Sequence, residues 1–274
     1  MPLQGPGERS RVMGRWPFMR MTRLPGIHHD ANCVVVMGEA SSLLIDAGTS
    51  WYQQLQVERI IGVLGEGQAP EHLLLTSRRF PFAGGAAHFV ETWPDLSPMV
   101  GEDGVAALET GDFFSTWANR YDSDMPSVVA TPVHDGEVIA LGDGGVQAVA
   151  LPGHAPEAMG FLVDDRSIAV VGGVLPRADL PARLDLPGAS PVAHRDSLLR
   201  LQSLQLQSLV PMRGPAIRGM KHVEEVLQRH LDHFDAVLAD DGRRPKGWPR
   251  PAPSALWLTP LSPWPLDERE ADDA

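Results

Sequence analysis

Two neighbouring arginines, a serine and a distant histidine are the residues of this chain whose types could do chemistry. Ser77, Arg78 and Arg79 follow one another directly after a run of leucines and a threonine. Arginine stays protonated and grips carboxylates or phosphates through paired hydrogen bonds, so Arg78 and Arg79 are candidates for binding an anionic substrate. His154 is a candidate general acid or base, because the unperturbed pKa of imidazole is near neutral pH. The alternative for His154 is a turn histidine bonded to backbone.

Ser77 is a candidate catalytic nucleophile if it lies beside a base. A serine paired with His154 would have the arrangement of an activated hydroxyl. The residues around Ser77 do not form the Gly-x-Ser-x-Gly elbow that presents the nucleophile in many hydrolases. The alternative is that Ser77 has no chemical role.

Six stretches between residues 32 and 215 follow the order of landmarks in a known family. Residues 75–85 read Leu-Thr-Ser-Arg-Arg-Phe-Pro-Phe-Ala-Gly-Gly, which resembles the metallo-β-lactamase superfamily loop in which Leu-Thr runs into His-x-His-x-Asp-His and Gly-Gly. The other five stretches are residues 32–48, 135–142, 151–160, 168–173 and 209–215. The resemblance, to glyoxalase II-like hydrolases among others, implies an α+β fold. We expect the four-layer αβ/βα sandwich of this superfamily, with two mixed sheets face to face and helices outside.

The resemblance also shows which residues stand at the family's zinc-ligand positions. Zinc takes imidazole, thiolate or carboxylate donors, and among the residues at these positions only His154 has such a donor. The first site would be Ser77, Arg79 and His154, the second Pro81, Phe82 and Arg213, and the bridging aspartate would be Gly173. We therefore expect no metal at this site and no other cofactor.

The resemblance places Arg79 and Arg213 in one cleft, where two guanidinium groups would repel each other unless an anion or a carboxylate lies between them. The partner is either an internal carboxylate or a bound carboxylate or phosphate. Asp46 is retained from the family's Ile-Asp-x-Gly as a structural residue outside the ligand shell, and it is a candidate partner for Arg79. Phe82 would make the former metal pocket smaller and more apolar, and would contact the substrate.

Three functions remain open. The first is a metal-independent protein that binds, and could transform, a small anionic acyl, lactone or thioester-type metabolite in the degenerate cleft. The second is a catalytically inactive pseudoenzyme that works through protein contacts. The third is a zinc hydrolase whose metal site has been rebuilt from His28 or His29 with His154, although adjacent side chains in a strand point to opposite faces.

Composition limits the classes of partner. The chain has 274 residues and a net charge of −12, from 23 basic and 35 acidic side chains. This balance argues against nucleic-acid binding, which depends on neutralising phosphates. No apolar run is long enough to span a membrane, and residues 1–20 do not have the apolar region of a secretory signal, so a cytoplasmic protein is expected. The single cysteine, Cys33, excludes an intrachain disulfide.

The pattern along the chain predicts one domain with two extensions. Residues 1–20 are expected to be a flexible arm, residues 21–242 the metallo-β-lactamase-like domain, and residues 243–274 a Pro/Trp-rich extension. A protein partner or a second copy of the chain could bind through that extension. Helices are predicted at residues 51–65, from 85, at 103–121 with Trp117 on the helix, at 196–209 and at 221–240, and strands at 21–48, 72–76 and 128–172.

Overall fold

The computed structural model describes residues 19–142, 144–163, 167–183 and 185–249. Its strands form two six-stranded mixed sheets. The first sheet contains β1 (Arg20–Leu24), β2 (Cys33–Met37), β3 (Ser42–Ile45), β4 (His72–Leu75), β5 (Ser97–Gly101) and β6 (Thr131–Val133), in that spatial order. The second contains β7 (Val138–Ala140), β8 (Gly145–Ala150), β9 (Met159–Val163), β10 (Ile168–Gly172), β11 (Ser208–Pro211) and β12 (Ile217–Arg218), side by side in sequence order.

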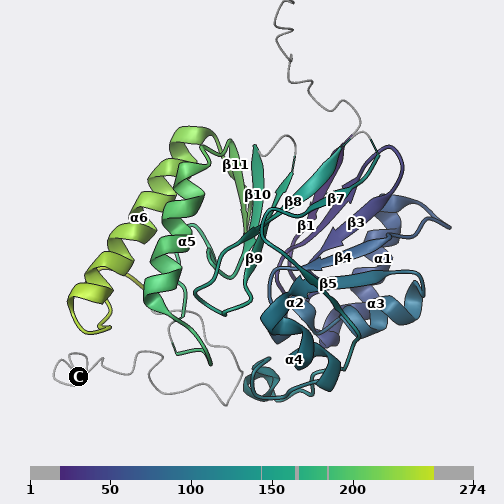
Figure 1. The fold of residues 1–274 in the computed structure, drawn as a ribbon, viewed down its shortest axis with the longest axis horizontal. Coiled ribbons are helices and arrows are strands. Elements are labelled where there is room, and N and C mark those ends of the chain that lie inside the picture. The colour runs from purple at the N-terminus through teal and green to yellow at the C-terminus, as the bar shows by residue number, and fades with distance from the viewer. Residues whose placement is uncertain (1–18, 143, 164–166, 184, 250–274) are drawn as a thin grey trace, which may run out of the picture.

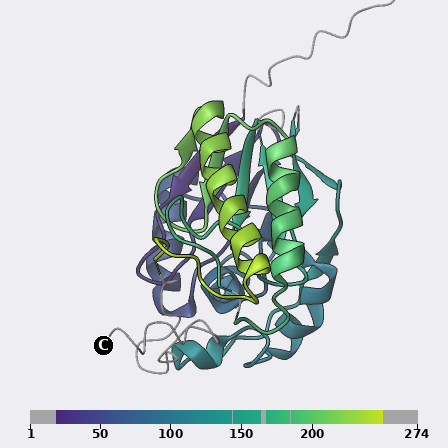
Figure 2. The same ribbon diagram turned by 90° about the vertical axis from the view of Figure 1, so that its left-hand side faces the viewer.

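Helices cover the outer face of each sheet (Figure 1). The first sheet is covered by α1 (Gln53–Leu64) and α3 (Ala86–Thr92), with α2 (Phe80–Ala83) and α4 (Val105–Thr110) at one end. The second is covered by α5 (Pro191–Ser203) and α6 (Met220–Ala239), which lie side by side across it (Figure 2). Three short 3-10 helices are η1 (Ser50–Tyr52), η2 (Glu102–Gly104) and η3 (Ala118–Tyr121).

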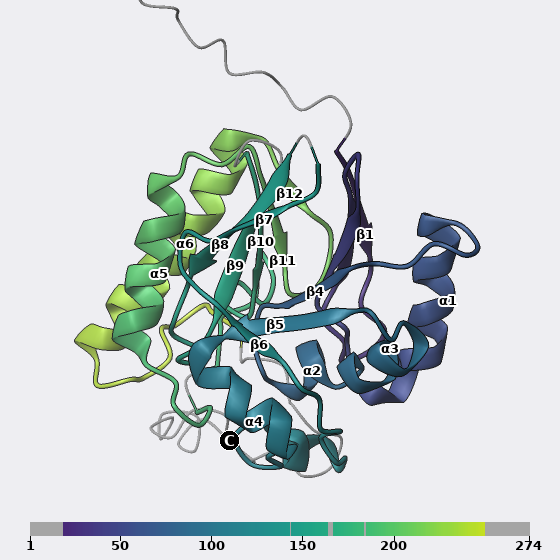
Figure 3. The same ribbon diagram turned by 45° about the vertical axis from the view of Figure 1, so that its right-hand side comes forward.

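The helices and the two sheets form four layers (Figure 3). The apolar side chains form three layers of core between them. Successive residues of β2 alternate: Val35 packs under α1 and α3, whereas Val34 packs between the two sheets. In the second sheet Val170 faces the first sheet, whereas Val171 packs against α5 and α6. Strands buried on both faces read as continuous apolar runs. The predicted α+β four-layer sandwich is confirmed.

Most of the predicted helices are present, but the prediction of a helix at residues 103–121 is wrong. The pattern at 103–121 predicted one helix, but α4 ends at Thr110 and η3 begins only at Ala118. Gly111 ends α4 in the left-handed conformation, and the Asp112 carboxylate then accepts hydrogen bonds from the backbone N–H groups of Phe114 and Ser115. This turn chemistry outweighs the apolar spacing.

The predicted helix at 196–209 is shifted. It begins at Pro191, because Ser190 caps it by accepting a hydrogen bond from the Ala193 N–H, and it ends before β11. The helices α1 and α6 match their predictions closely.

The described residues say little about the two extensions. Residues 1–18 and 250–274 lie outside them, so the expected arm and most of the expected C-terminal extension stay predictions. Trp248 is described, and its ring packs against His230 and His233 of α6, with the Arg229 guanidinium over it. No helix in the described ranges is long and apolar enough to cross a bilayer.

Candidate functional site

A pocket opens where the loops after β4, β8, β10 and β11 meet, at one end of the two sheets. It encloses about 580 Å³ of space outside protein atoms, part of it open to solvent. Three arginines and a histidine line it among mostly apolar side chains. The lining residues are Arg79, Pro81, Phe82, Trp117, Tyr121, His154, Gly173, Pro176, Leu180, Pro181, Arg183, Leu186, Met212 and Arg213. Every former ligand position except Ser77 therefore borders the pocket, as the resemblance implied.

Arg79 is bonded to backbone from three separate loops. Its Nη2 donates to the carbonyl oxygens of His154 at 2.9 Å and Pro187 at 2.7 Å, and its Nη1 donates to that of Ser115 at 3.2 Å. The side chain is buried, and burial lowers its pKa to about 10, so it stays charged at neutral pH. No carboxylate in the described part of the chain lies within ion-pair distance of it, and its Nε has no hydrogen-bond partner there.

Arg78 and Ser77 are held by one buried carboxylate. Glu157 forms an ion pair with the Arg78 guanidinium and also accepts hydrogen bonds from the Ser77 hydroxyl at 2.9 Å and the Arg78 N–H at 3.0 Å. The Glu157 side chain is fully buried. Ser77 therefore bonds to a carboxylate, not to His154, and Arg78 does not line the pocket. The geometry gives both residues a structural role and does not bring Ser77 and His154 together as a nucleophile and base.

Asp46 does not pair with Arg79. Its carboxylate accepts from the Thr76 N–H at 2.7 Å and from the Thr76 hydroxyl, which fixes the end of β4 just before the Ser77–Arg79 segment. Burial raises the pKa of Asp46 to about 8, and the hydrogen bonds from Thr76 act against this rise. Its structural role is as expected, but the proposed partnership with Arg79 was wrong.

His154 is buried at the pocket and presents an uncharged imidazole. Burial, with the charge of Arg79 as a smaller cause, holds its pKa well below the usual value. Neither ring nitrogen has a hydrogen-bond partner among the described residues, and the ring packs 5.7 Å from that of Phe82. The ring lies so close to Gly173 that a Cβ there would come within 2.3 Å of Nε2. Gly173 therefore leaves room for the ring where the family has a bridging aspartate.

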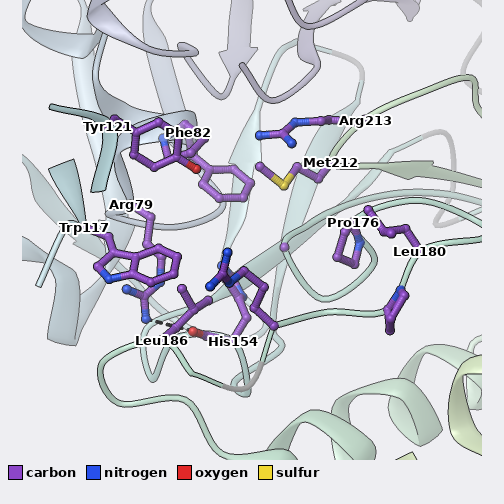
Figure 4. A pocket seen from close by; sticks show the side chains of 14 residues that line it. Arg79, Phe82, Trp117, Tyr121, His154, Pro176, Leu180, Leu186, Met212 and Arg213 are labelled. Atoms are coloured by element: carbon purple, nitrogen blue, oxygen red, sulfur yellow. Dashed lines mark hydrogen bonds between the residues drawn. The ribbon is translucent and has the colours of Figure 1, made fainter. Parts of the chain in front are cut away.

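Arg213 and Tyr121 form a polar pair on the opposite side of the pocket from His154. Arg213 donates through Nε and Nη2 to the backbone oxygens of Asp30 and His29. Burial raises the pKa of the nearby Tyr121 hydroxyl, and the charge of Arg213 acts against this rise. In Figure 4 its side chain reaches toward Phe82 and Tyr121, while Arg79 lies beside Trp117. Like Arg79, Arg213 has no carboxylate at ion-pair distance within the described ranges.

Trp117 and Arg183 form another wall of the pocket. The Arg183 guanidinium lies 4.6 Å from the centre of the Trp117 ring, and Asp185 pairs with it. Trp117 has a φ of 64°, a left-handed conformation that is strained for a bulky side chain. Such strain persists only where the surroundings enforce it, and it concentrates at functional sites. Trp117 borders the pocket from a turn, and not from the helix on which the pattern placed it.

The donor set does not fit a zinc or iron centre. Guanidinium groups cannot donate lone pairs to a metal, and the Arg79 head group occupies the position of a ligand while it donates hydrogen bonds to carbonyl oxygens. No group of three or more His, Cys, Asp or Glu side chains within the described ranges could hold a metal ion.

His28 and His29 do not join His154 in such a group. The His28 ring stacks on Tyr52 at 5.4 Å, and the His29 ring packs edge-on against Tyr121 at 5.7 Å. The two side chains thus lie in different contacts, as their adjacency predicted.

Comparison with known proteins agrees with this architecture. The family model of the metallo-β-lactamase superfamily matches residues 27–212, and the chain belongs to that superfamily. Among solved structures, TTHA1623 in a di-iron-bound form is 26% identical with a TM-score of 0.60, covering 73% of this chain and 96% of that one. The metallo-β-lactamase family protein TTHA1429 from Thermus thermophilus is 18% identical with a TM-score of 0.64, covering 80% and 82%, and shows the fold alone.

A curated relative is known from a fungus. The lactamase-like protein nscB of Aspergillus fumigatus is 27% identical over 151 residues, which are 54% of this chain and 39% of that protein. The match therefore spans less than half the length of this relative.

Sequence reasoning missed Glu157, Tyr121 and Arg183. Tyr121 is one of only two tyrosines in the chain, and Arg183-x-Asp185 repeats the Arg-x-Asp spacing of Arg177 and Asp179 in the same loop. Neither signal says that the residue reaches the pocket, because that depends on how the loops 111–130 and 173–190 fold over the sheet ends. Glu157 stands within the 151–160 landmark and could have been tested as a partner for the arginines.

Proposed function

We propose that this protein binds a small organic anion of the acyl, lactone or thioester type in the former metal cleft without using a metal there. One observation supports this most directly: two guanidinium groups, Arg79 and Arg213, border a largely apolar pocket with no carboxylate partner in the described part of the chain. Carboxylates at longer range offset part of these charges, Glu157 and Asp185 for Arg79 and Asp30 for Arg213. Burying a charge without an ion-pair partner is costly. A bound anion would supply that partner.

The two arginines have different parts in this proposal. Arg79 cross-links three loops and provides positive potential from the pocket wall, where its hydrogen bonds to carbonyl oxygens fix it in place. Arg213 lies at the rim, only partly buried, and its Nη1 is not used in its bonds to His29 and Asp30. The ligand would therefore contact Arg213 directly and be attracted by both charges.

Any chemistry at this site would use His154 to move a proton. At neutral pH the imidazole is uncharged, so one ring nitrogen can accept a proton from water or substrate. Ser77 does not act as its partner nucleophile, since the Ser77 hydroxyl donates to Glu157. Binding without turnover, as in a pseudoenzyme, is the second candidate, and the position of Ser77 favours it.

The test is ligand-dependent stability of the purified full chain. A carboxylate or acyl thioester at 100 times its dissociation constant should raise the unfolding free energy by about 2.7 kcal/mol and the melting temperature by roughly 5–10 °C. The variant Arg213→Met should lose the shift. Arg195→Met, which removes the same charge from the exposed surface of α5, should keep it. If no carboxylate, phosphate or thioester shifts the wild type, the proposal is wrong.

His154→Ala separates binding from turnover. Hydrolysis of an acyl ester or thioester that falls to background in this variant, with the ligand-induced shift retained, would assign proton transfer to His154. If the wild type binds the compound and never converts it, the protein is a binding protein.

A further inference from the structure

The pocket has a polar end and an apolar body. Arg213 and Tyr121 line one end, and Tyr121 lies in the field of Arg213, Arg79 and Arg183. Much of the remaining wall is apolar and comes from several loops. It includes Phe82, Pro176, Leu180, Leu186 and Met212. A ligand that fills this space must combine a small charged head with a hydrophobic body.

The polar end offers donors from two side chains. Two of the five N–H groups of Arg213 donate to the backbone oxygens of His29 and Asp30, and neither N–H of its Nη1 is used in these bonds. The Tyr121 hydroxyl can donate its own proton, because burial raises its pKa and keeps it protonated. Arg213 Nη1 and the Tyr121 hydroxyl can therefore each bind one oxygen of a carboxylate. A phosphate has three oxygens and nearly twice the charge, and most of its hydrogen bonds would be lost among apolar side chains.

The imidazole of His154 adds a requirement on the body of the ligand. Its ring nitrogens are buried and have no partner among the described residues, although they border the pocket. A neutral imidazole offers one donor and one acceptor. An uncharged carbonyl, ester or hydroxyl group would satisfy it, whereas a second negative charge on the ligand would lie in an apolar wall beside Phe82.

From these contacts we infer that the ligand is a hydrophobic monocarboxylate, whose carboxylate is bound by Arg213 and the Tyr121 hydroxyl and whose body carries an uncharged polar group that faces His154. This inference rests on the proposed function and narrows it to one ligand class. It also makes Tyr121 a residue that determines specificity.

The experiment is a calorimetric titration of the full chain with simple probes. Butanoate, hexanoate and octanoate have the same head group and differ in the length of the body. Each buried methylene should strengthen binding about fourfold until the pocket is filled. Hexanamide, which has the same body without the charge, and inorganic phosphate, which has charge without the body, should both bind at least tenfold more weakly than hexanoate.

Tyr121→Phe removes one oxygen atom and keeps the ring that packs against Phe80 and Trp51. It should weaken octanoate binding about tenfold or more and weaken hexanamide binding by a smaller factor, because a hydrogen bond to a neutral oxygen is weaker than one to a carboxylate. Equal affinity of the variant and the wild type for octanoate would overturn the role of Tyr121.

The outcomes separate this inference from the proposed function. If inorganic phosphate binds more tightly than octanoate, or if affinity does not rise with chain length, the ligand class is wrong while anion binding stands. If no anion binds and the wild-type protein is folded, both fail.

Discussion

Neutralising Glu157 should be among the most damaging single substitutions in this fold. Glu157→Gln keeps an oxygen that can accept from the Ser77 hydroxyl and the Arg78 N–H, but it removes the only carboxylate paired with the Arg78 guanidinium in the described structure. Both side chains are almost completely buried, so Arg78 would become a buried charge without a partner. Breaking a pair of this kind lowers the unfolding free energy by about 3–5 kcal/mol. Because the amide preserves two hydrogen bonds, we expect Glu157→Gln to lower it by about 3 kcal/mol.

Urea unfolding followed by tryptophan fluorescence would measure this loss. Asp179→Asn is the matched control, because the Arg177–Asp179 pair has the same chemistry with both side chains at least half exposed, and it should change stability by no more than about 0.5 kcal/mol. The double variant Arg78→Met with Glu157→Gln should recover part of the loss, since the uncompensated charge is gone. If Glu157→Gln costs less than about 1 kcal/mol, the ion pair does not hold the Ser77–Arg79 segment as described.

Three further substitutions test the site and the contacts that support it. Burial lowers the pKa of His230 to about 4, so between pH 6.5 and 4 the unfolded chain binds the extra proton and acid destabilises the fold. His230→Gln keeps a donor for the Ala178 carbonyl and should reduce the loss of unfolding free energy between pH 7 and 5 by about 2 kcal/mol. An unchanged pH profile from urea titrations would contradict this. Gly173→Ala should lower the unfolding free energy by about 1–3 kcal/mol and weaken ligand binding, because the added methyl displaces the His154 ring. A variant with the melting temperature and the ligand affinity of the wild type would show that Gly173 is not needed to make room for the ring. Arg79→Met leaves three carbonyl oxygens without their donor and should lower the unfolding free energy by about 3 kcal/mol, whereas a more stable variant would show that the buried charge is the larger effect.

The fold could be predicted because its signals are local and repeated. The apolar run at β4 and the amphipathic pattern of α6 each specify an element, and the order of the landmarks specifies how the elements are joined. The break after Thr110 was missed because Gly111 and Asp112 act through a turn, which the apolar spacing does not reveal.

The pocket could be located from the sequence, but its chemistry could not be completed. The former ligand positions pointed to Arg79, His154 and Arg213, and these residues do border one pocket. The wall that contains Arg183 is set by contacts from distant helices: His194 of α5 bonds to the Val174 carbonyl and His230 of α6 bonds to that of Ala178. Such long-range contacts leave no periodic pattern in the loop that they position.

Guanidinium groups stand at two positions where the superfamily places metal ligands, and we propose that they replace the metal centre in this cleft. The most direct test is the metal content of the full chain, purified without chelator, re-equilibrated with zinc, and measured by mass spectrometry. The substitutions at Ser77, Arg79 and Arg213 predict a content far below one equivalent, unchanged in the variant His154→Ala. A full equivalent of zinc or iron that is lost in that variant would show that a metal site exists around His154 and that the guanidinium groups do not replace it.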